Sequence, residues 1–280
     1  MRGTMQRIAA WSKDLTRGFD REWKAQALLA ATGARAFFFP FSLFFVAGGF
    51  LPAGFGWMSS AIIMLSGAAT LLAELRSMSL RAALARFLGI AGILLIIEYA
   101  GVNTGFPFGA YAYTDALGLT VAGVPLAISV AWYCTVVNSW RIAEHLISGL
   151  KLRGPLVTAL LAGMLTLGLD LALEPMAGFI QKYWVWESNE VPLQNYLSWF
   201  ALSVIAVYLL ARTDRGGWEN GEVRFRVAVF LFGFHFVLFL MTILVHGYLL
   251  AAGIALALVL SPFALLALRV RLLRPNPARR

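Results

Sequence analysis

Apolar stretches of roughly 20 residues recur along this chain, separated by short polar segments. A helix of about that length crosses the roughly 30 Å hydrocarbon core of a bilayer. The pattern therefore predicts an all-α fold, a polytopic transmembrane helical bundle. The predicted spans, about eight in number, are Leu28–Phe50, Trp57–Leu75, Ala82–Tyr99, Pro125–Ile147, Leu156–Leu173, Gln194–Leu210, Arg226–Val245 and Tyr248–Leu268. We divide the chain into a basic amphipathic N-terminal segment (1–27), a transmembrane domain (28–268) and a basic cytoplasmic tail (269–280).

The basic residues provide a test of the predicted number of spans, because they collect in alternate loops. The loops on one side of the predicted bundle contain Arg76, Arg81, Arg86, Lys151, Arg153, Arg212, Arg215, Arg224 and Arg226. The loops on the other side contain only Lys182. By the positive-inside rule, both termini are cytoplasmic, and we expect a multi-pass protein of the plasma (inner) membrane.

The amino-acid composition narrows the class of protein further. With 60% hydrophobic and 13% charged residues, the chain is far from the composition of a soluble domain. The net charge of +9 does not indicate a nucleic-acid partner, because no soluble stretch is long enough to hold such a module. The basic residues instead flank apolar spans, where they face anionic lipid. Cys134 is the single cysteine, and the three histidines form no cluster, so we predict no metal site.

Two stretches do not fit the role of simple connections. Glu98–Pro125 and Asp170–Trp199 are rich in acidic and aromatic residues, and both are predicted to lie at the outer face. Each begins within or directly after a helix that carries a carboxyl group. We predict that together they build one acid-lined, aromatic pocket.

The acids within the predicted spans require an explanation, because an ionised group at a span centre costs about 2.5–3.5 kcal/mol on insertion scales. Asp170 and Glu174 are four residues apart and share a helix face. Two neighbouring acids repel, so one of them keeps a proton, as a reaction that begins with proton donation requires. The alternative is an interfacial pair wetted at the helix end. Glu98 ends its span where the helix dipole disfavours a carboxylate, which favours a functional role over a merely solvated helix end.

The neighbouring aromatic residues also allow two interpretations. Tyr111, Tyr113, Trp184 and Trp186 fit an aromatic belt at the membrane interface. Alternatively, their ring faces stabilise a developing cation, an effect of about 2 kcal/mol when water is excluded.

Other charged residues are more simply explained as structural. We interpret Glu74, beside Arg76, as an interfacial flank. Arg141 and Glu144 are spaced i, i+3 and are predicted to form an ion pair.

The two stretches resemble a known family. The residues Glu98-Tyr99, Gly101, Thr104-Gly105-Phe106-Pro107-Phe108-Gly109, Tyr111 and Tyr113 are similar to a signature of the membrane carotenoid-biosynthesis proteins, which include carotenoid hydratases. The second block of that family is similar to Asp170, Glu174-Pro175, Trp184-Val185-Trp186, Val191-Pro192-Leu193, Asn195 and Trp199. One departure is Glu174, where the family pattern more often has Asp.

The resemblance implies a cofactor-independent hydratase that adds water to the terminal C1–C2 double bond of an acyclic carotenoid end group, of the γ-carotene or lycopene type. On this basis Asp170 and Glu174 supply a proton and Glu98 positions or deprotonates the water, or the two roles are exchanged. Binding roles fall on Asn103, Phe108, Tyr111, Tyr113, Trp184, Trp186, Asn195 and Trp199. The expected partners are a carotenoid, the lipid bilayer and other carotenoid-pathway enzymes. A carotenoid cyclase or isomerase, and a non-catalytic carotenoid-binding or transport protein, remain the alternatives.

Overall fold

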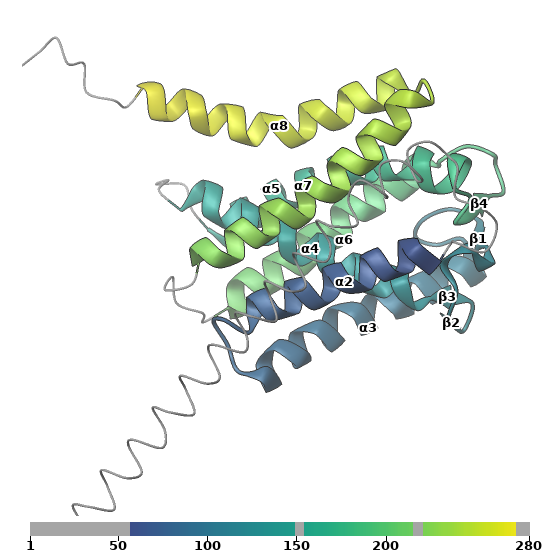
Figure 1. Cartoon of the computed structure of the whole chain (residues 1–280), viewed down its shortest axis with the longest axis horizontal. Coiled ribbons are helices and arrows are strands. Elements are labelled where there is room, and N and C mark those ends of the chain that lie inside the picture. Colours follow the sequence, from purple (N-terminus) through teal and green to yellow (C-terminus); the bar gives the residue numbers. More distant parts are fainter. Residues whose placement is uncertain (1–56, 149–153, 215–220, 273–280) are drawn as a thin grey trace, which may run out of the picture.

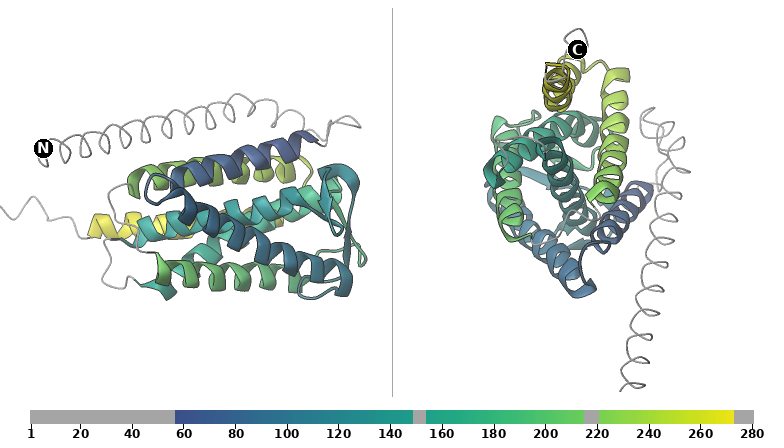
Figure 2. Two further views of the ribbon diagram at one scale, coloured as in Figure 1. Left: turned by 90° about the horizontal axis from the view of Figure 1, so that it is seen from below. Right: turned by 90° about the vertical axis from the view of Figure 1, so that its left-hand side faces the viewer.

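The structure is a computed structural model that describes residues 57–148, 154–214 and 221–272. It contains seven α-helices in these residues: α2 (Trp57–Glu74), α3 (Leu80–Thr104), α4 (Leu126–Ile147), α5 (Pro155–Glu174), α6 (Leu193–Thr213), α7 (Gly221–Val245) and α8 (Leu249–Leu272). They run along one long direction and form a bundle, with α8 at its periphery (Figures 1 and 2). The predicted span Leu28–Phe50 and the segments 1–27 and 273–280 lie outside the described residues.

Each predicted span from Trp57 onward corresponds to one of these helices. The predominantly helical architecture is therefore confirmed, with ends that differ by a few residues; α3, for example, continues to Thr104 rather than ending at Tyr99. Four of the described segments are long and apolar enough to cross a membrane: Leu80–Thr104, Pro155–Ile180, Leu193–Thr213 and Gly221–Val245. The count of eight spans, the division into domains and the side on which the termini lie remain predictions.

Helix α4 forms the centre of the bundle. It contacts α2, α3, α5 and α7, and 17 of its 22 residues are buried. A helix that is covered on all sides is apolar over most of its surface, and few of its polar residues are charged. By contrast, α3 buries only one stripe of side chains and leaves Leu88, Ile93 and Ile96 more than 60% exposed, as expected for a lipid-facing helix.

Short strands connect the two acidic, aromatic stretches. Strand β1 (Tyr111–Tyr113) pairs antiparallel with β4 (Trp184–Trp186), so that Tyr111 lies opposite Trp186 and Tyr113 opposite Trp184. A second small pair joins β2 (Thr120–Val121) to β3 (Val124–Pro125). Both pairs lie at the same end of the bundle (Figure 1). The two stretches therefore meet, as the sequence predicts.

Glycine and proline shape the segments around these strands. Gly105 caps α3 in the left-handed conformation, with φ of 74°, and its N–H donates to the Gly101 carbonyl. A side chain at Gly101 would come within 2.8 Å of the Phe108 ring, so glycine here allows the following loop to fold back onto α3. At the end of α5, Pro175 has no N–H to donate, and the chain continues as a π-helical turn, Pro175–Ile180.

The opposite end of the bundle contains a network of ion pairs. Arg141 donates to Glu74 at 2.6 and 2.8 Å, to Glu144 at 3.0 Å and to Asp214 at 2.9 Å. Arg86 also bonds to Glu74, and to Asp214 at 3.0 Å. The predicted Arg141–Glu144 pair is confirmed. The interpretation of Glu74 as an interfacial flank is wrong: this side chain is 1% exposed and is held by arginines from α3 and α4.

Candidate functional site

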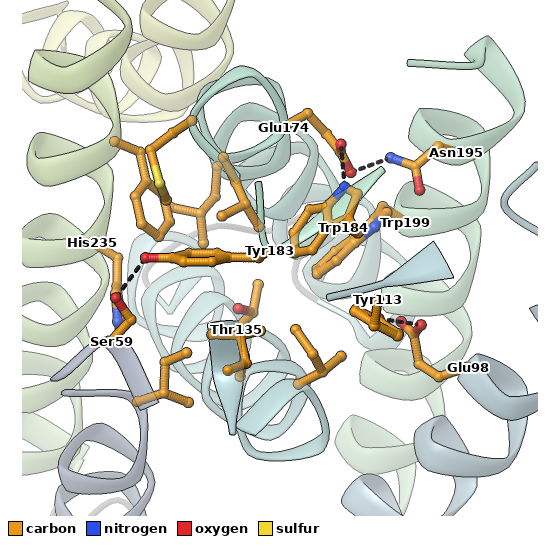
Figure 3. A pocket seen from close by; sticks show the side chains of 18 of the residues that line it. Ser59, Glu98, Tyr113, Thr135, Glu174, Tyr183, Trp184, Asn195, Trp199 and His235 are labelled. Atoms are coloured by element: carbon orange, nitrogen blue, oxygen red, sulfur yellow. Dashed lines mark hydrogen bonds between the residues drawn. The ribbon is translucent and has the colours of Figure 1, made fainter. Parts of the chain in front are cut away.

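A cavity lies beneath the paired strands (Figure 3). The empty space in and around it, part of which is open to solvent, is about 1020 Å³, and its wall is mostly apolar. The wall includes nine of the residues predicted for the site: Glu98, Phe108, Tyr111, Tyr113, Glu174, Trp184, Trp186, Asn195 and Trp199. Side chains from α3, α5, α6 and both strands β1 and β4 therefore face one common space.

Glu98 accepts three hydrogen bonds from aromatic side chains. Its Oε2 receives the hydroxyl of Tyr111 at 2.5 Å and that of Tyr113 at 2.7 Å, and its Oε1 receives Nε1 of Trp132 at 2.7 Å. The carboxyl group comes from the last turns of α3, the tyrosines from β1 and the tryptophan from α4. Three donors from two other elements fix the position of this carboxyl at the cavity wall.

Glu174 is held in the same manner from the other strand. Its Oε2 accepts Nε1 of Trp184 and Nε1 of Trp186, each at 3.1 Å, and its Oε1 accepts the amide of Asn195 at 2.8 Å. Because side chains alternate along a strand, both tryptophans of β4 point inward while Val185 between them is 48% exposed.

The two carboxyl sites share one layer of aromatic rings. The Tyr111 and Trp186 rings are 5.2 Å apart, and those of Tyr113 and Trp184 are 6.1 Å apart in an edge-to-face arrangement. The tyrosines of β1 serve Glu98, and the tryptophans of β4 serve Glu174. The pairing of two short strands therefore sets the relative position of two acids that are distant in sequence.

Asp170 lies behind Glu174 rather than on the cavity wall. It is 1% exposed, and its Oδ2 accepts the same Asn195 amide at 3.3 Å. Its Oδ1 is buried and has no hydrogen-bond partner in the described part of the chain. Two buried acids thus share one side-chain donor, an arrangement that favours keeping a proton on one of them.

None of these three carboxyl groups forms an ion pair within the described residues. All their hydrogen-bond donors are neutral. An acid site without a compensating cation can hold and deliver a proton, and it can later accept one, without first breaking an ion pair.

The tyrosines at Glu98 stay protonated over the ordinary pH range. Burial, followed by the neighbouring Glu98 carboxylate, raises the pKa of the Tyr111 hydroxyl well above its usual value. The same two causes raise the pKa of Tyr113. Both hydroxyls therefore act as donors to Glu98.

Asn103 is a predicted site residue that the structure places away from both the cavity and its acids. It is exposed in the last turn of α3, and its amide donates to the Tyr99 carbonyl at 2.7 Å. The spacing from Glu98 explains this placement: an offset of five residues is not one of the i+3 and i+4 offsets that share a helix face.

Several residues of the site were not predicted from the sequence. Trp132 bonds to Glu98 and stacks on Trp199, with ring centroids 3.6 Å apart. It lies inside an apolar span, where no charged residue close in sequence distinguishes it. Ser59 and Tyr183 also line the cavity and share a 2.5 Å hydrogen bond between their hydroxyls, and burial raises the pKa of Tyr183 to about 12. His235 of α7 lines the same region.

No group of three or more His, Cys, Asp or Glu side chains in the described ranges is arranged to hold a metal ion.

Comparison with known proteins gives two matches. A model of the family described as "Carotenoid biosynthesis protein" matches residues 58–262. Bisanhydrobacterioruberin hydratase of Haloarcula japonica is 32% identical over a region that covers 40% of this chain and 39% of that protein. The match therefore spans well under half of the relative's length. No solved structure matches the chain.

Proposed function

Since the chain belongs to the carotenoid biosynthesis protein family, we propose that it is a membrane hydratase that adds water to the terminal C1–C2 double bond of an acyclic carotenoid end group. The observation that carries this proposal is the cavity itself. Two carboxyl groups face it, a third lies directly behind, and neutral donors and aromatic rings surround them. The named relative, a hydratase, supports the reaction class.

The proposed reaction balances with water alone. A carboxylic acid transfers its proton to C2 of the terminal double bond, and the π electrons form the new C–H bond. This leaves a tertiary cation at C1. A water oxygen bonds to C1 and loses a proton to a carboxylate, which gives a tertiary alcohol and leaves one acid deprotonated and the other protonated. A proton transfer between the two acids then restores the starting state.

Glu174 is the proposed proton donor, because it is the member of the Asp170–Glu174 pair that faces the cavity. Asp170 shares the Asn195 amide with it from behind. A proton held by this pair can therefore reside on either acid, but only Glu174 can deliver it to a bound olefin. In this proposal Asp170 is a positioning residue that keeps the pair protonated.

Glu98 is the proposed base that takes the proton from the attacking water. As a carboxylate it is stabilised by three neutral donors. No ion-pair partner among the described residues has to be released when Glu98 accepts a proton from water. The role fits its position, because Glu98 lies on the β1 side of the aromatic layer and Glu174 on the β4 side.

The rings between the two acids have the properties needed to stabilise the cation. Phe108, Tyr111, Tyr113, Trp184 and Trp186 all line the cavity. A cation over a desolvated aromatic face gains about 2 kcal/mol. The same rings limit the access of bulk water.

Expression in a bacterium that makes lycopene or γ-carotene, followed by mass analysis of the pigments, tests the proposal. The expected product is heavier by one water, and Glu98→Gln, Glu174→Gln and Asp170→Asn should accumulate the unhydrated substrate. Glu187→Gln is the matched control, because this acid of the same outer segment is exposed. A product of unchanged mass would indicate a cyclase or isomerase instead. Unchanged pigment that co-purifies with wild type and amide variants alike would indicate a carotenoid-binding protein.

A further inference from the structure

The cavity has two ends with different chemistry. The acids lie at the end formed by α3, the end of α5 and the first turns of α6, whereas Ser59 of α2 and His235 of α7 lie at the other (Figure 3). If the reacting end group lies at the acids, the rest of a rigid polyene must leave the cavity at another point, because the polyene is much longer than the cavity. Trp186, Trp199 and Asn195 at the acid end are buried, whereas Ile63 and Phe239 at the far end are partly exposed.

Helices α2 and α7 each turn one face toward this far end. The lining residues of α2 are Ser59, Ile62 and Ile63, and those of α7 are His235, Leu238 and Phe239. Both sets have the spacing i, i+3, i+4, which places three side chains on one side of a helix. Apart from Ser59 and His235, the surface they form is hydrocarbon.

Toward the opposite end of the bundle, α2 and α7 meet in a small apolar cluster of their own. That cluster consists of Ala69 and Ala73 from α2 and Val227 and Leu231 from α7. Small residues on α2 allow a close approach there. From that contact the helices diverge toward the end where the strands lie (Figure 1), which is where the six lining residues are found.

We propose that the seam between α2 and α7 is the passage through which the polyene chain of the substrate extends from the cavity. Ile62 and Ile63 on one side and Leu238 and Phe239 on the other contact the chain, while its end group lies at Glu98 and Glu174. This inference rests on the proposed function for the position of the end group. It adds a binding surface that the acid site does not require.

Tryptophan substitutions in full-length protein test the passage. Ile63→Trp and Phe239→Trp add bulk at partly exposed positions of the seam. The matched controls are Met64→Trp and Val237→Trp, at 41%-exposed positions on the same two helices that do not line the cavity. We expect the seam variants to retain at least tenfold less lycopene on purification than the controls, at equal protein yield and melting temperature.

A second readout separates the passage from general damage to the site. Dihydromyrcene has the same type of dimethyl-substituted terminal double bond but is too short to leave the cavity. The ratio of lycopene hydration to dihydromyrcene hydration should fall about tenfold in the seam variants and stay constant in the controls. Equal lycopene retention in seam and control variants, or an unchanged ratio, would overturn the inference. If wild type hydrates neither compound, the proposed reaction fails, and lycopene retention alone still decides whether the seam holds the polyene.

Discussion

Two clusters of acids lie at opposite ends of this bundle, and they differ in what surrounds them. At one end Glu74, Glu144 and Asp214 are paired with Arg141 or Arg86, and the Arg141 guanidinium lies 3.6 Å from the centre of the Trp140 ring. At the other end Glu98, Asp170 and Glu174 have only neutral partners.

The comparison shows how the partners of a buried acid indicate its role. An acid held by arginine stays ionised and ties helices together, and removing one member of such a pair leaves an unpaired charge that costs about 3–5 kcal/mol. An acid held by neutral donors can change its protonation state with little reorganisation. The first arrangement is suited to structure, and the second to proton transfer.

The largest expected effect is on activity at the cation-free end. Glu174→Gln or Glu98→Gln should lower the rate of carotenoid hydration by about 10²- to 10⁴-fold, the usual contribution of a general acid or base. Melting temperature should fall less than in a variant that breaks an arginine pair, because the amide nitrogen leaves one of the neutral donors without an acceptor but leaves no cation unpaired. Pigment conversion and thermal melting in detergent measure the two quantities. A large loss of stability would instead place these acids in the same structural class as Glu74.

The next effect is on stability at the arginine-rich end. Arg141→Met should lower the free energy of unfolding by about 3–5 kcal/mol, because it leaves Glu74 buried without its main partner. Hydration per folded molecule should change less than twofold. Arg226→Met is the control: its pair with Glu222 is exposed, with 75% and 56% of the two side chains accessible, so its loss should cost under about 1 kcal/mol. Similar losses of stability in Arg141→Met and Arg226→Met would show that the buried arginine network is no more stabilising than an exposed pair.

A smaller effect is expected at the hydroxyls that hold Glu98. Tyr113→Phe keeps the ring and removes one of three donors, so hydration should fall by roughly tenfold, in line with the loss of one hydrogen bond to a charged group. Because the pKa of Tyr113 is raised, its hydroxyl stays a donor as the pH passes the ordinary tyrosine value of 10.0. The wild-type rate should therefore show no fall from tyrosine ionisation near that pH. A descending limb near 10 that Tyr113→Phe abolishes would contradict this.

The pH dependence of stability provides a finer test of the ion-pair network. Burial acts to raise the pKa of Asp214, but Arg141 and Arg86 outweigh it and hold the pKa below its ordinary value of 3.8. For a lowered pKa, the stabilisation is complete above 3.8 and is lost as the pH falls below it. Melting temperature should thus drop below about pH 4 in wild type, and Asp214→Asn should weaken that drop. If the melting temperatures of wild type and Asp214→Asn fell in the same way at acidic pH, Asp214 would not contribute to the acid sensitivity.

The smallest effect concerns Asn103. Because this side chain is exposed and bonded to the Tyr99 carbonyl, Asn103→Ala should leave both hydration and melting temperature within experimental error. Asn195→Ala is the informative counterpart, since that amide contacts both Asp170 and Glu174. A strong loss in Asn103→Ala would show that substrate binding extends to the exposed end of α3.

Patterns within one element were readable from the sequence, and contacts between elements were not. Apolar run lengths located the helices from Trp57 onward, and spacing identified the Arg141–Glu144 pair and the shared face of Asp170 and Glu174. The resemblance added the two blocks that meet through β1 and β4. The pairing of Glu74 with Arg141 crosses from α2 to α4, and no local spacing encodes it. Trp132 was missed for the same reason: its partner, Glu98, is on another helix.

Hydration of lycopene or γ-carotene in D₂O is the most direct test of proton transfer from the acid pair to the olefin. Deuterium on the hydroxyl exchanges during work-up, whereas deuterium on carbon is retained. The account predicts one carbon-bound deuterium beside each carbinol carbon in the wild-type product, and none in carotenoid recovered from Glu174→Gln. A hydrated product without carbon-bound deuterium would contradict it.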